Sequence, residues 1–539
     1  MSITRSHITS RPSTEHSATS TYLEIPCLSG EISLIHHSCK FSFLQLPPIT
    51  SPSVQLLTVA VICLLCPGMF NALNGLGGAG LVAPGPANES NIALYAGFAI
   101  VGFFAGFIVN VVGLKASLFV GGISYVVYAG SFLAYKHIEN RGLLIFGGSF
   151  LGLCAGPFWA AQGAMLISYP SDEQKGRSTS WFWAIYNSGA AIGSLVSNFI
   201  LQSSQSDSLS QGYSFQELQT SSGNVASDNI YITIIALMFA GAVLSLCLCQ
   251  PKNVKRKDGS RVHVTVTVET DWRNEVMHFC KLVRKDYFIV LLFPMFLTSN
   301  WCYPYQFNTF NLKTFNIRTR ALNNFLYWLS EILGALVVGH TLDNDRLSRS
   351  VRAKGLVAGL VLLTFGIWTG GYMWQKGHYY QTDIAAEGQK MDFDNAHYLG
   401  PMFLYIAYGI FNAMWQNCVY WILGRFTSDT RTASIYIGFY KGIQSAGGAI
   451  SYRINNSNIS ATNEFLICWV LLAVSLVVAA PVIIYKIRDE TDEEDTAGEE
   501  TATEVGLARV DEEKSKAVND SIPRVDGKLS EGSWKASPV

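Results

Sequence analysis

The stretch Trp159-Ala-Ala-Gln162 opens a pattern that continues through Ser171-Asp172 and Arg177 to Tyr186-Asn187. About 254 residues later the chain reads Trp415-Gln416, then Ser428-Asp429, Arg431 and Tyr440-Lys441. Each copy is an apolar segment, a short polar turn with a serine–aspartate step, a basic residue and a second apolar segment. Such an internal repeat indicates that two halves share one plan. The plan consists of apolar helices, so the repeat predicts two similar helical bundles.

The composition favours a membrane protein. Charged residues make up 14% of the 539 residues, well below the ~25% of an average soluble protein. Aromatic residues reach 12% and glycines number 47, and both are frequent in membrane helices. The net charge of −1 gives no reason to expect a nucleic-acid partner, and the 11 cysteines are too scattered for a disulfide framework.

Twelve segments have the length of about 20 mainly apolar residues that crosses a hydrocarbon core. They are approximately 54–73, 91–112, 117–135, 142–168, 178–201, 229–249, 287–309, 319–340, 353–374, 397–423, 432–452 and 463–487. Because backbone groups find no water inside lipid, each segment is expected to be helical. The predicted fold is therefore an all-α membrane protein with twelve transmembrane helices in two pseudo-symmetric six-helix bundles.

The basic residues orient this predicted bundle. With both termini in the cytoplasm, most lysines and arginines of the loops fall on the inner side, as the positive-inside rule requires. Three glycosylation triplets, at Asn88, Asn455 and Asn458, then fall in outer loops. The sequence thus predicts a multi-pass protein with cytoplasmic termini that is glycosylated at these three asparagines. Outward glycosylation suits the plasma membrane better than the vacuole, although the vacuole has the same topology.

Composition shifts divide the chain into five predicted regions. Residues 1–50 are rich in serine, threonine and histidine, and residues 489–539 begin with a run of acids, so both are predicted to be disordered tails. The bundles are predicted at 51–250 and 287–488. A basic cytoplasmic linker at 251–286 joins them.

Two polar turns resemble a motif of the major facilitator superfamily, G-x-x-x-D-x-x-G-x-K/R, which that family places after its second span. The first turn carries Gly106, Asn110, Gly113 and Lys115, with asparagine in place of the aspartate. The equivalent turn of the second half keeps Gly339, Asp343 and Arg346 but lacks the second glycine. Close helix approach at glycine, a polar cap and a base that pairs across the turn predict a conformational latch. An ordinary basic inner turn is the alternative.

Within that superfamily the chain is similar to the fungal Unc-ninety-three-like (uncoordinated) branch. The resemblance lies in residues 66–77 (CPGMFNALNGLG), 156–163 (GPFWAAQG) and 438–445 (GFYKGIQS). It implies a transporter fold without settling the function. Many members have no assigned substrate, and some animal members act as accessory subunits of potassium channels or as escorts for receptors.

Two ionisable residues fall near the centres of predicted spans. They are Glu331 in 319–340 and Lys441 in 432–452. A charge at this depth costs several kcal/mol unless it is paired, hydrated or neutralised. Both are candidates for substrate or proton handling, and a structural ion pair or polar contact within the second half is the alternative.

Uncharged candidates lie on the same kind of segment. The resemblance implies that the first, fourth, seventh and tenth spans line a central cavity. On these and neighbouring spans the candidates are Asn71, Asn74, Trp159, Gln162, Tyr186, Asn187, Trp415, Gln416 and Tyr440. Helix–helix contacts are the alternative. Asn71 and Asn74 end the first span before a glycine-rich stretch, where a broken helix would offer backbone groups to a ligand, and a loop turn is the alternative there. The polar and aromatic residues at 301–308 are interpreted as an outer aromatic belt, with a binding site as the alternative.

Recognisable enzyme motifs are missing from the sequence. It contains no P-loop for ATP and no metal-ligand spacing, so we expect no enzymatic activity and no cofactor. The predicted function is alternating-access transport of a small molecule or ion across the lipid bilayer, with proton coupling left open. The alternative is a non-transporting membrane subunit that regulates a channel or escorts a receptor, with a membrane protein as its partner.

Overall fold

The computed structural model describes most of residues 48–486. Within that range, the positions left out are 82–83, 171–174, 211–225, 256–272, most of 274–286, 343–345, 379–389, 427–429 and 458. Residues 1–47 and 487–539 lie outside the described part, so the predicted disorder of the tails stays a prediction. So does the linker at 251–286, of which few residues are described. The N-terminal half below means the described residues of 48–255, and the C-terminal half means those of 287–486.

Helices account for nearly all of the N-terminal half. They are α1 (Pro52–Cys63), η1 (Leu64–Gly68), α2 (Met69–Gly75), η2 (Gly78–Gly80), α3 (Pro84–Gly102), α4 (Ala105–Val112), α5 (Leu114–Ile138), α6 (Arg141–Ser168), α7 (Lys175–Ser210), α9 (Asp228–Leu244), η4 (Ser245–Cys247) and η5 (Pro251–Asn253). The six segments predicted here each coincide with helical structure. Local signals set several ends: Ser51 caps α1 ahead of Pro52, and Asn140 caps α6.

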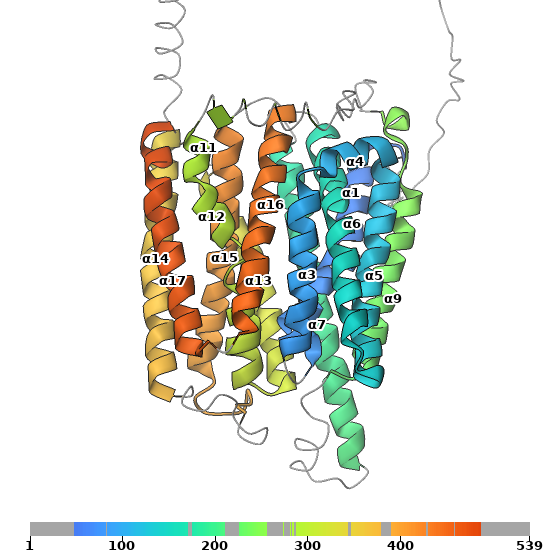
Figure 1. The fold of residues 1–539 in the computed structure, drawn as a ribbon, viewed down its shortest axis with the longest axis vertical. Helices are drawn as coiled ribbons and strands as arrows, with labels where there is room; N and C mark the ends of the chain where they lie inside the picture. Colours follow the sequence, from blue (N-terminus) through green and yellow to red (C-terminus); the bar gives the residue numbers. More distant parts are fainter. Residues whose placement is uncertain are drawn as a thin grey trace, which may run out of the picture. The chain divides into compact units, whose positions relative to one another are not determined.

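The C-terminal half repeats this pattern. Its helices are α11 (Phe288–Leu291), α12 (Phe293–Thr298), η6 (Tyr305–Leu312), α13 (Ile317–Leu342), α14 (Arg349–His378), α15 (Leu399–Phe426), α16 (Thr430–Asn455), α17 (Ala461–Pro481) and η8 (Val482–Lys486). The six remaining predicted segments coincide with these helices. In Figure 1 the helices of each half run alongside one another and gather on opposite sides of a common boundary.

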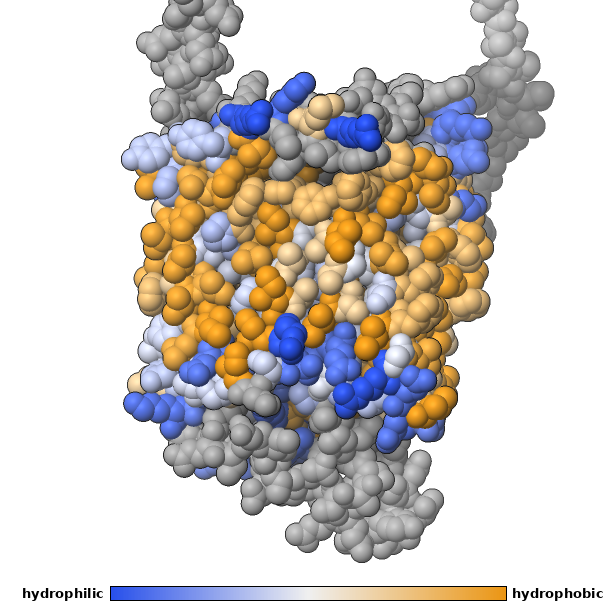
Figure 2. Space-filling model, in the orientation of Figure 1, coloured by the Kyte–Doolittle hydropathy of each residue, from blue (hydrophilic) through white to orange (hydrophobic). Residues whose placement is uncertain are grey.

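Length and composition agree with a membrane environment. Among the described residues, seven helical stretches are long and apolar enough to cross a bilayer, including Pro52–Gly75 and Ala461–Lys486. Helices α3, α7, α15 and α16 are not among the seven, and all four line the boundary between the halves. Figure 2 shows an apolar band around the middle of one face, with hydrophilic residues toward both ends. The molecule is an all-α membrane protein.

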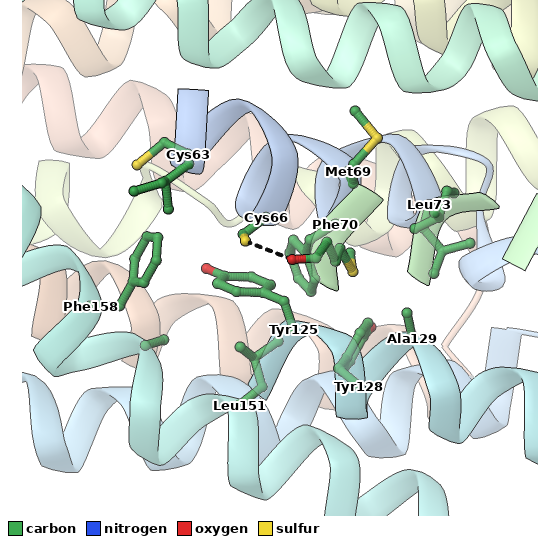
Figure 3. Packing of buried hydrophobic residues seen from close by; sticks show 14 of the residues in the cluster. Cys63, Cys66, Met69, Phe70, Leu73, Tyr125, Tyr128, Ala129, Leu151 and Phe158 are labelled. Atoms are coloured by element: carbon green, nitrogen blue, oxygen red, sulfur yellow. Dashed lines mark hydrogen bonds between the residues drawn. The ribbon is translucent and has the colours of Figure 1, made fainter. Parts of the chain in front are cut away.

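Each half packs around its own apolar core. The first core is built mainly from the N-terminal half, and the second mainly from the C-terminal half. In the first, Tyr125 lies between Phe70 and Phe158 (Figure 3). Its ring centre is 5.7 Å from that of each of the two. These rings join the first helix, which consists of α1, η1 and α2 in succession, to α5 and α6. Because each half has its own apolar core, neither half depends on the contacts between the halves for its packing.

The boundary between the halves is formed by a few long helices. α3 packs along α16, and α7 packs along α13. Small residues permit this approach: a Cβ added to Gly442 of α16 would lie 3.1 Å from the ring of Phe103. These two helix pairs flank a central cavity near mid-height and a tightly bonded region at one end.

Candidate functional site: a central cavity and a polar seal

A central cavity lies between the halves. Seven of the predicted candidates line it: Asn71, Trp159, Tyr186, Asn187, Glu331, Gln416 and Lys441. Residues not predicted from the sequence complete the polar part of the wall: Asn300, Tyr303, Asn417, Tyr420 and Gln444. The lining comes from the first helix, α3, α5, α6 and α7 on one side and from 300–303, α13, α15 and α16 on the other.

Glu331 supplies the acidic group of the cavity. It lies on α13, and only 5% of its surface is exposed. The amide of Asn412 on α15 donates to its Oε1 at 2.6 Å. The same amide donates to the hydroxyl of Tyr303 at 2.8 Å. The carboxyl group therefore has one neutral side-chain donor and otherwise faces the cavity.

Lys441 supplies the basic group, from α16. Its Nζ donates to Oε1 of Gln444 at 2.9 Å. The Nζ also lies 5.1 Å from the ring centre of Tyr440 and 5.3 Å from that of Tyr420, which is within reach of a cation–π interaction. These contacts hold the ammonium group without neutralising its charge.

No ion pair joins Glu331 to Lys441, both of which belong to the described residues. Neutral groups separate them instead. Gln416 donates to the Tyr303 hydroxyl at 3.3 Å, and Gln444 donates to Oε1 of Gln416 at 3.5 Å. A continuous path of amides and one phenol thus runs across the C-terminal half from the acid to the base. The direct structural ion pair considered from the sequence is not formed.

Aromatic rings dominate the opposite wall. Trp159 and Tyr186 meet edge to face with their centres 5.5 Å apart, and Asn71 donates to the Tyr186 hydroxyl at 2.9 Å. Trp183 of α7 reaches across the boundary to Tyr420 of α15, at 5.6 Å between ring centres. The cavity therefore has an aromatic wall on the N-terminal side and a charged, amide-rich wall on the C-terminal side.

Four predicted candidates do not line the cavity. Gln162 is buried elsewhere on α6, and Trp415 donates its indole N–H to the carbonyl of Met295. Tyr440 packs on Phe296 at 5.1 Å. For Trp415 the physical reason is helical phase: Trp415 and Gln416 are adjacent on α15 and point about 100° apart, so only one of them faces the cavity.

Asn74, the fourth, is a structural residue. Its Oδ1 accepts hydrogen bonds from Asn91 at 3.0 Å and from the hydroxyl of Tyr128 at 3.1 Å. These bonds tie the first helix to α3 and α5 inside the N-terminal half. The Asn74 side chain thus has a structural role, and its amide oxygen is already occupied.

The interpretation of 301–308 as an aromatic belt is also wrong. Trp301, Tyr305, Gln306 and Asn308 are at most 6% exposed, and Tyr303 lines the cavity. An interfacial belt would instead present its rings to lipid headgroups. From Tyr305 the segment continues as the π-helix η6, all eight residues of which are buried.

The end of the first helix forms one part of a polar seal between the halves. α2 ends at Gly75, and Gly77 continues with a φ of 76°, a left-handed conformation that favours glycine. The carbonyls released by this break accept hydrogen bonds from the C-terminal half. Their donors are Asn324 to Ala72, Asn311 to Gly75, and the guanidinium of Arg320 to Leu76 and Gly77. The first span thus ends after Asn74, and the backbone groups exposed there bind the other half.

A buried cluster of amides forms the other part of the polar seal. Asn308 of η6 donates to Oδ1 of Asn88 at 2.8 Å, and Asn88 of α3 donates to Oδ1 of Asn455 at 2.7 Å. The amide of Asn455 then donates to Glu464 and Thr309. Oδ1 of Asn308 accepts the backbone N–H of Gly78 at 2.7 Å. Side chains from both halves thus satisfy one another at this end.

The seal corrects the predicted glycosylation. Asn88 is fully buried, and its amide nitrogen donates to Asn455, so it cannot carry a glycan in this fold. Asn455 is engaged in the same cluster through both of its side-chain atoms. Asn458 lies outside the described residues. The triplets therefore give the proposed orientation little independent support.

The predicted latch is seen only in part. Gly113 joins α4 to α5 with a φ of 89°, a left-handed conformation that favours glycine. A Cβ added at Gly113 or Gly339 would meet nothing within 4 Å. Close helix approach at these glycines is therefore wrong. Gly106 and Lys115 are exposed, as is Arg346, while Asp343 and the side chain of Asn110 lie outside the described part. The pairing across the turn stays a prediction, as do the serine–aspartate steps at 171–172 and 428–429.

Comparison with known proteins identifies the family. The family model described as "Ion channel regulatory protein UNC-93" matches residues 89–370. An UNC93-like protein of Schizosaccharomyces pombe is 44% identical over 445 residues, which cover 82% of this chain and 84% of that protein. UNC93-like protein 1 of Arabidopsis thaliana is 36% identical over 448 residues, covering 82% of this chain and 92% of that protein.

A solved structure agrees with the fold. The crystal structure of a D-xylose–proton symporter is similar with a TM-score of 0.54 and 14% identity, covering 81% of this chain and 98% of that one. At this identity the likeness concerns the fold alone. Fold and relatives together show that this chain is a multi-pass membrane protein of the UNC-93 family.

Proposed function

We propose that the protein is a secondary transporter that moves a small solute by alternating access. The observation that carries this proposal is the cavity between the halves, in which Glu331 and Lys441 face a common space without pairing with each other. Exposing a charge to such a site costs free energy unless a ligand, water or a proton compensates it. A solute-binding site accounts for this cost, whereas a purely structural interface would pair the two charges.

The polar seal supplies the second element that alternating access needs. It closes one end of the boundary by hydrogen bonds between the halves, while each half keeps its own core. Rocking of the halves would exchange these hydrogen bonds for contacts with water. We place the seal on the outer side, with both termini cytoplasmic, as the basic loops favour.

Glu331 is the proposed proton-handling group. Its carboxyl group is buried, and its one neutral side-chain donor, Asn412, bonds it without supplying a compensating charge. Either a proton or a cationic group of the solute would relieve its desolvation. Glu331→Gln mimics the protonated form, so it should preserve folding and change the pH dependence of uptake.

Proteoliposomes test the transport proposal. Vesicles with the wild-type protein, the Glu331→Gln variant or no protein are incubated with a polar-metabolite extract, and mass spectrometry identifies the components taken up. We expect protein-dependent uptake of at least one component, with altered pH dependence in the variant. Unaltered flux in a variant with lowered thermal stability would exclude the proton role.

A disulfide lock tests the role of the seal. Cysteines replacing Asn88 and Asn308, whose side chains are 2.8 Å apart across the boundary, should stop uptake on oxidation and restore it on reduction. The matched control replaces Gln375 and Thr462, which are hydrogen-bonded at 3.2 Å within the C-terminal half and outside the seal. Its oxidation should leave uptake unchanged. Equal inhibition by both locks would contradict alternating access at this boundary.

A channel-regulating subunit is the second candidate, because the matching family model is described as an ion channel regulatory protein. In that role the cavity would hold a structural or regulatory ligand, and the partner would be another membrane protein. The proteoliposome experiment separates the two functions. No protein-dependent uptake of any component, together with co-purification of an ion channel whose current depends on this protein, would favour the regulator.

A further inference from the structure

We infer that the cavity takes a zwitterionic solute with an aromatic or apolar body, such as an amino acid with a large side chain. This inference rests on the proposed function in so far as the cavity is a solute site. It concerns which solute the site recognises, which is a separate matter from whether that solute is transported.

The first argument is charge balance. Glu331 and Lys441 are the acid and the base of the cavity lining among the described residues. Each is held by a neutral amide, Asn412 or Gln444. A solute with one charge would compensate one of them and leave the other buried and unpaired, which is costly. A solute that carries an ammonium and a carboxylate compensates both.

The second argument is that neutral groups separate the acid from the base. The path from Glu331 to Lys441 runs through Asn412, Tyr303, Gln416 and Gln444. These groups hold the acid and the base apart on one wall. They also offer hydrogen bonds to the polar atoms of a solute that bridges the two charges.

The third argument is the opposite wall. Trp159, Tyr186 and Trp183 present ring edges and faces toward the same space. Rings of this kind bury apolar surface and favour edge-to-face contacts with another ring. The charged head of the solute would therefore lie on the C-terminal half, and its body would lie on the N-terminal half. A solute bound in this way contacts both halves at once.

Four related probes test the inference on purified full-length protein in detergent. They are L-phenylalanine, its cationic amide, its anionic N-acetyl form and the neutral N-acetyl amide. Calorimetry gives a Kd for each. We expect wild-type protein to bind phenylalanine at least about tenfold more tightly than the singly charged forms, and the neutral form least tightly. Binding of none of the four, or no preference for phenylalanine, overturns the inference.

Two variants then locate the charges. Glu331→Gln should shift the preference toward N-acetylphenylalanine, and Lys441→Met toward phenylalaninamide. The same shift in both variants, or no shift in either, overturns the assignment. The wild-type ranking tests the inference even where a variant fails to fold, and a monodisperse elution profile identifies that case.

The results separate this inference from the transport proposal. Charge-selective binding without uptake of radiolabelled phenylalanine or of any extract component would support the binding site and contradict transport. Uptake of an uncharged compound by a protein that does not distinguish the four probes would support transport and overturn the zwitterion site.

Discussion

The cavity and the polar seal lie on the same boundary but treat their polar groups differently. In the seal, Arg320 donates to backbone carbonyls, and Asn88, Asn308 and Asn455 bond one another. In the cavity, Glu331 and Lys441 each have one neutral amide partner and an open side. Buried polar groups that bond one another contribute stability, whereas partly bonded ones retain capacity for a ligand. The seal is therefore expected to govern stability, and the cavity to govern binding.

We expect the largest loss of stability when Arg320 of the seal is replaced. Arg320 is fully buried, and Arg320→Met removes the guanidinium donors to Leu76 and Gly77. We expect the free energy of unfolding in detergent to fall by about 3 kcal/mol or more, because the carbonyls lose charge-assisted hydrogen bonds. The matched control is Arg453→Met on exposed α16 surface at the same end, expected within about 0.5 kcal/mol. Equal losses in the two variants would show that Arg320 has no special role.

Gly75→Ala should have the next largest effect. A Cβ at Gly75 would lie 1.8 Å from Oδ1 of Asn324, so that side chain must move and give up its bond to Ala72. We expect a loss of about 2 kcal/mol, measured by thermal unfolding in detergent. Gly339→Ala is the control, since its Cβ meets nothing within 4 Å. Adding Asn324→Ala to Gly75→Ala should recover part of the loss, and no recovery would argue against the clash.

Asp392→Asn tests a contact that lies within one half. Burial alone would raise the pKa of the Asp392 carboxyl, but hydrogen bonds from Arg318 and Thr319 outweigh it and hold the pKa below its usual value. The stability from this carboxylate is therefore present above the unfolded pKa and is lost as pH falls through the folded pKa. We expect Asp392→Asn to cost about 1 kcal/mol at pH 7.

The difference between Asp392→Asn and wild type should shrink once the pH falls below about 3.9, the ordinary aspartate pKa. Thermal unfolding in detergent over a pH series measures it. Asp394→Asn serves as the control because the Asp394 side chain is 70% exposed. A gap that widens with acidification would contradict the sign.

Asn187→Ala should have the smallest effect on stability. Asn187 lines the cavity, so its loss should change the free energy of unfolding by about 0.5 kcal/mol or less while weakening solute binding. Asn74→Ala is the matched comparison, because Asn74 is bonded to Asn91 and Tyr128 and should cost clearly more. Thermal unfolding and calorimetry with phenylalanine measure the two effects. A larger stability loss for Asn187 would remove the distinction between lining and structural asparagines.

Much of the fold was predictable because it follows from local composition. Apolar segments of membrane-spanning length and a repeat between residues 159 and 441 specify helices and two halves. The depth of Glu331 and Lys441 in their helices also follows from sequence position. Tyr303 was assigned to the aromatic belt and Asn412 was not predicted, because the contacts that join them to Glu331 run between separate helices. Gln444 lies one helical turn after Lys441 on α16, and this spacing was the signal that could have identified it.

Sequence alone determined which parts of this protein are helical and apolar, since hydrogen bonding in lipid leaves the backbone little choice. Only the tertiary structure decided which face of each helix meets which partner. Asn88 illustrates the difference: its triplet reads as an exposed acceptor, yet packing of α3 against α16 and η6 buries it among other amides. The outcome depends on rotation of each helix about its axis, which is set by packing across the boundary and not by local sequence.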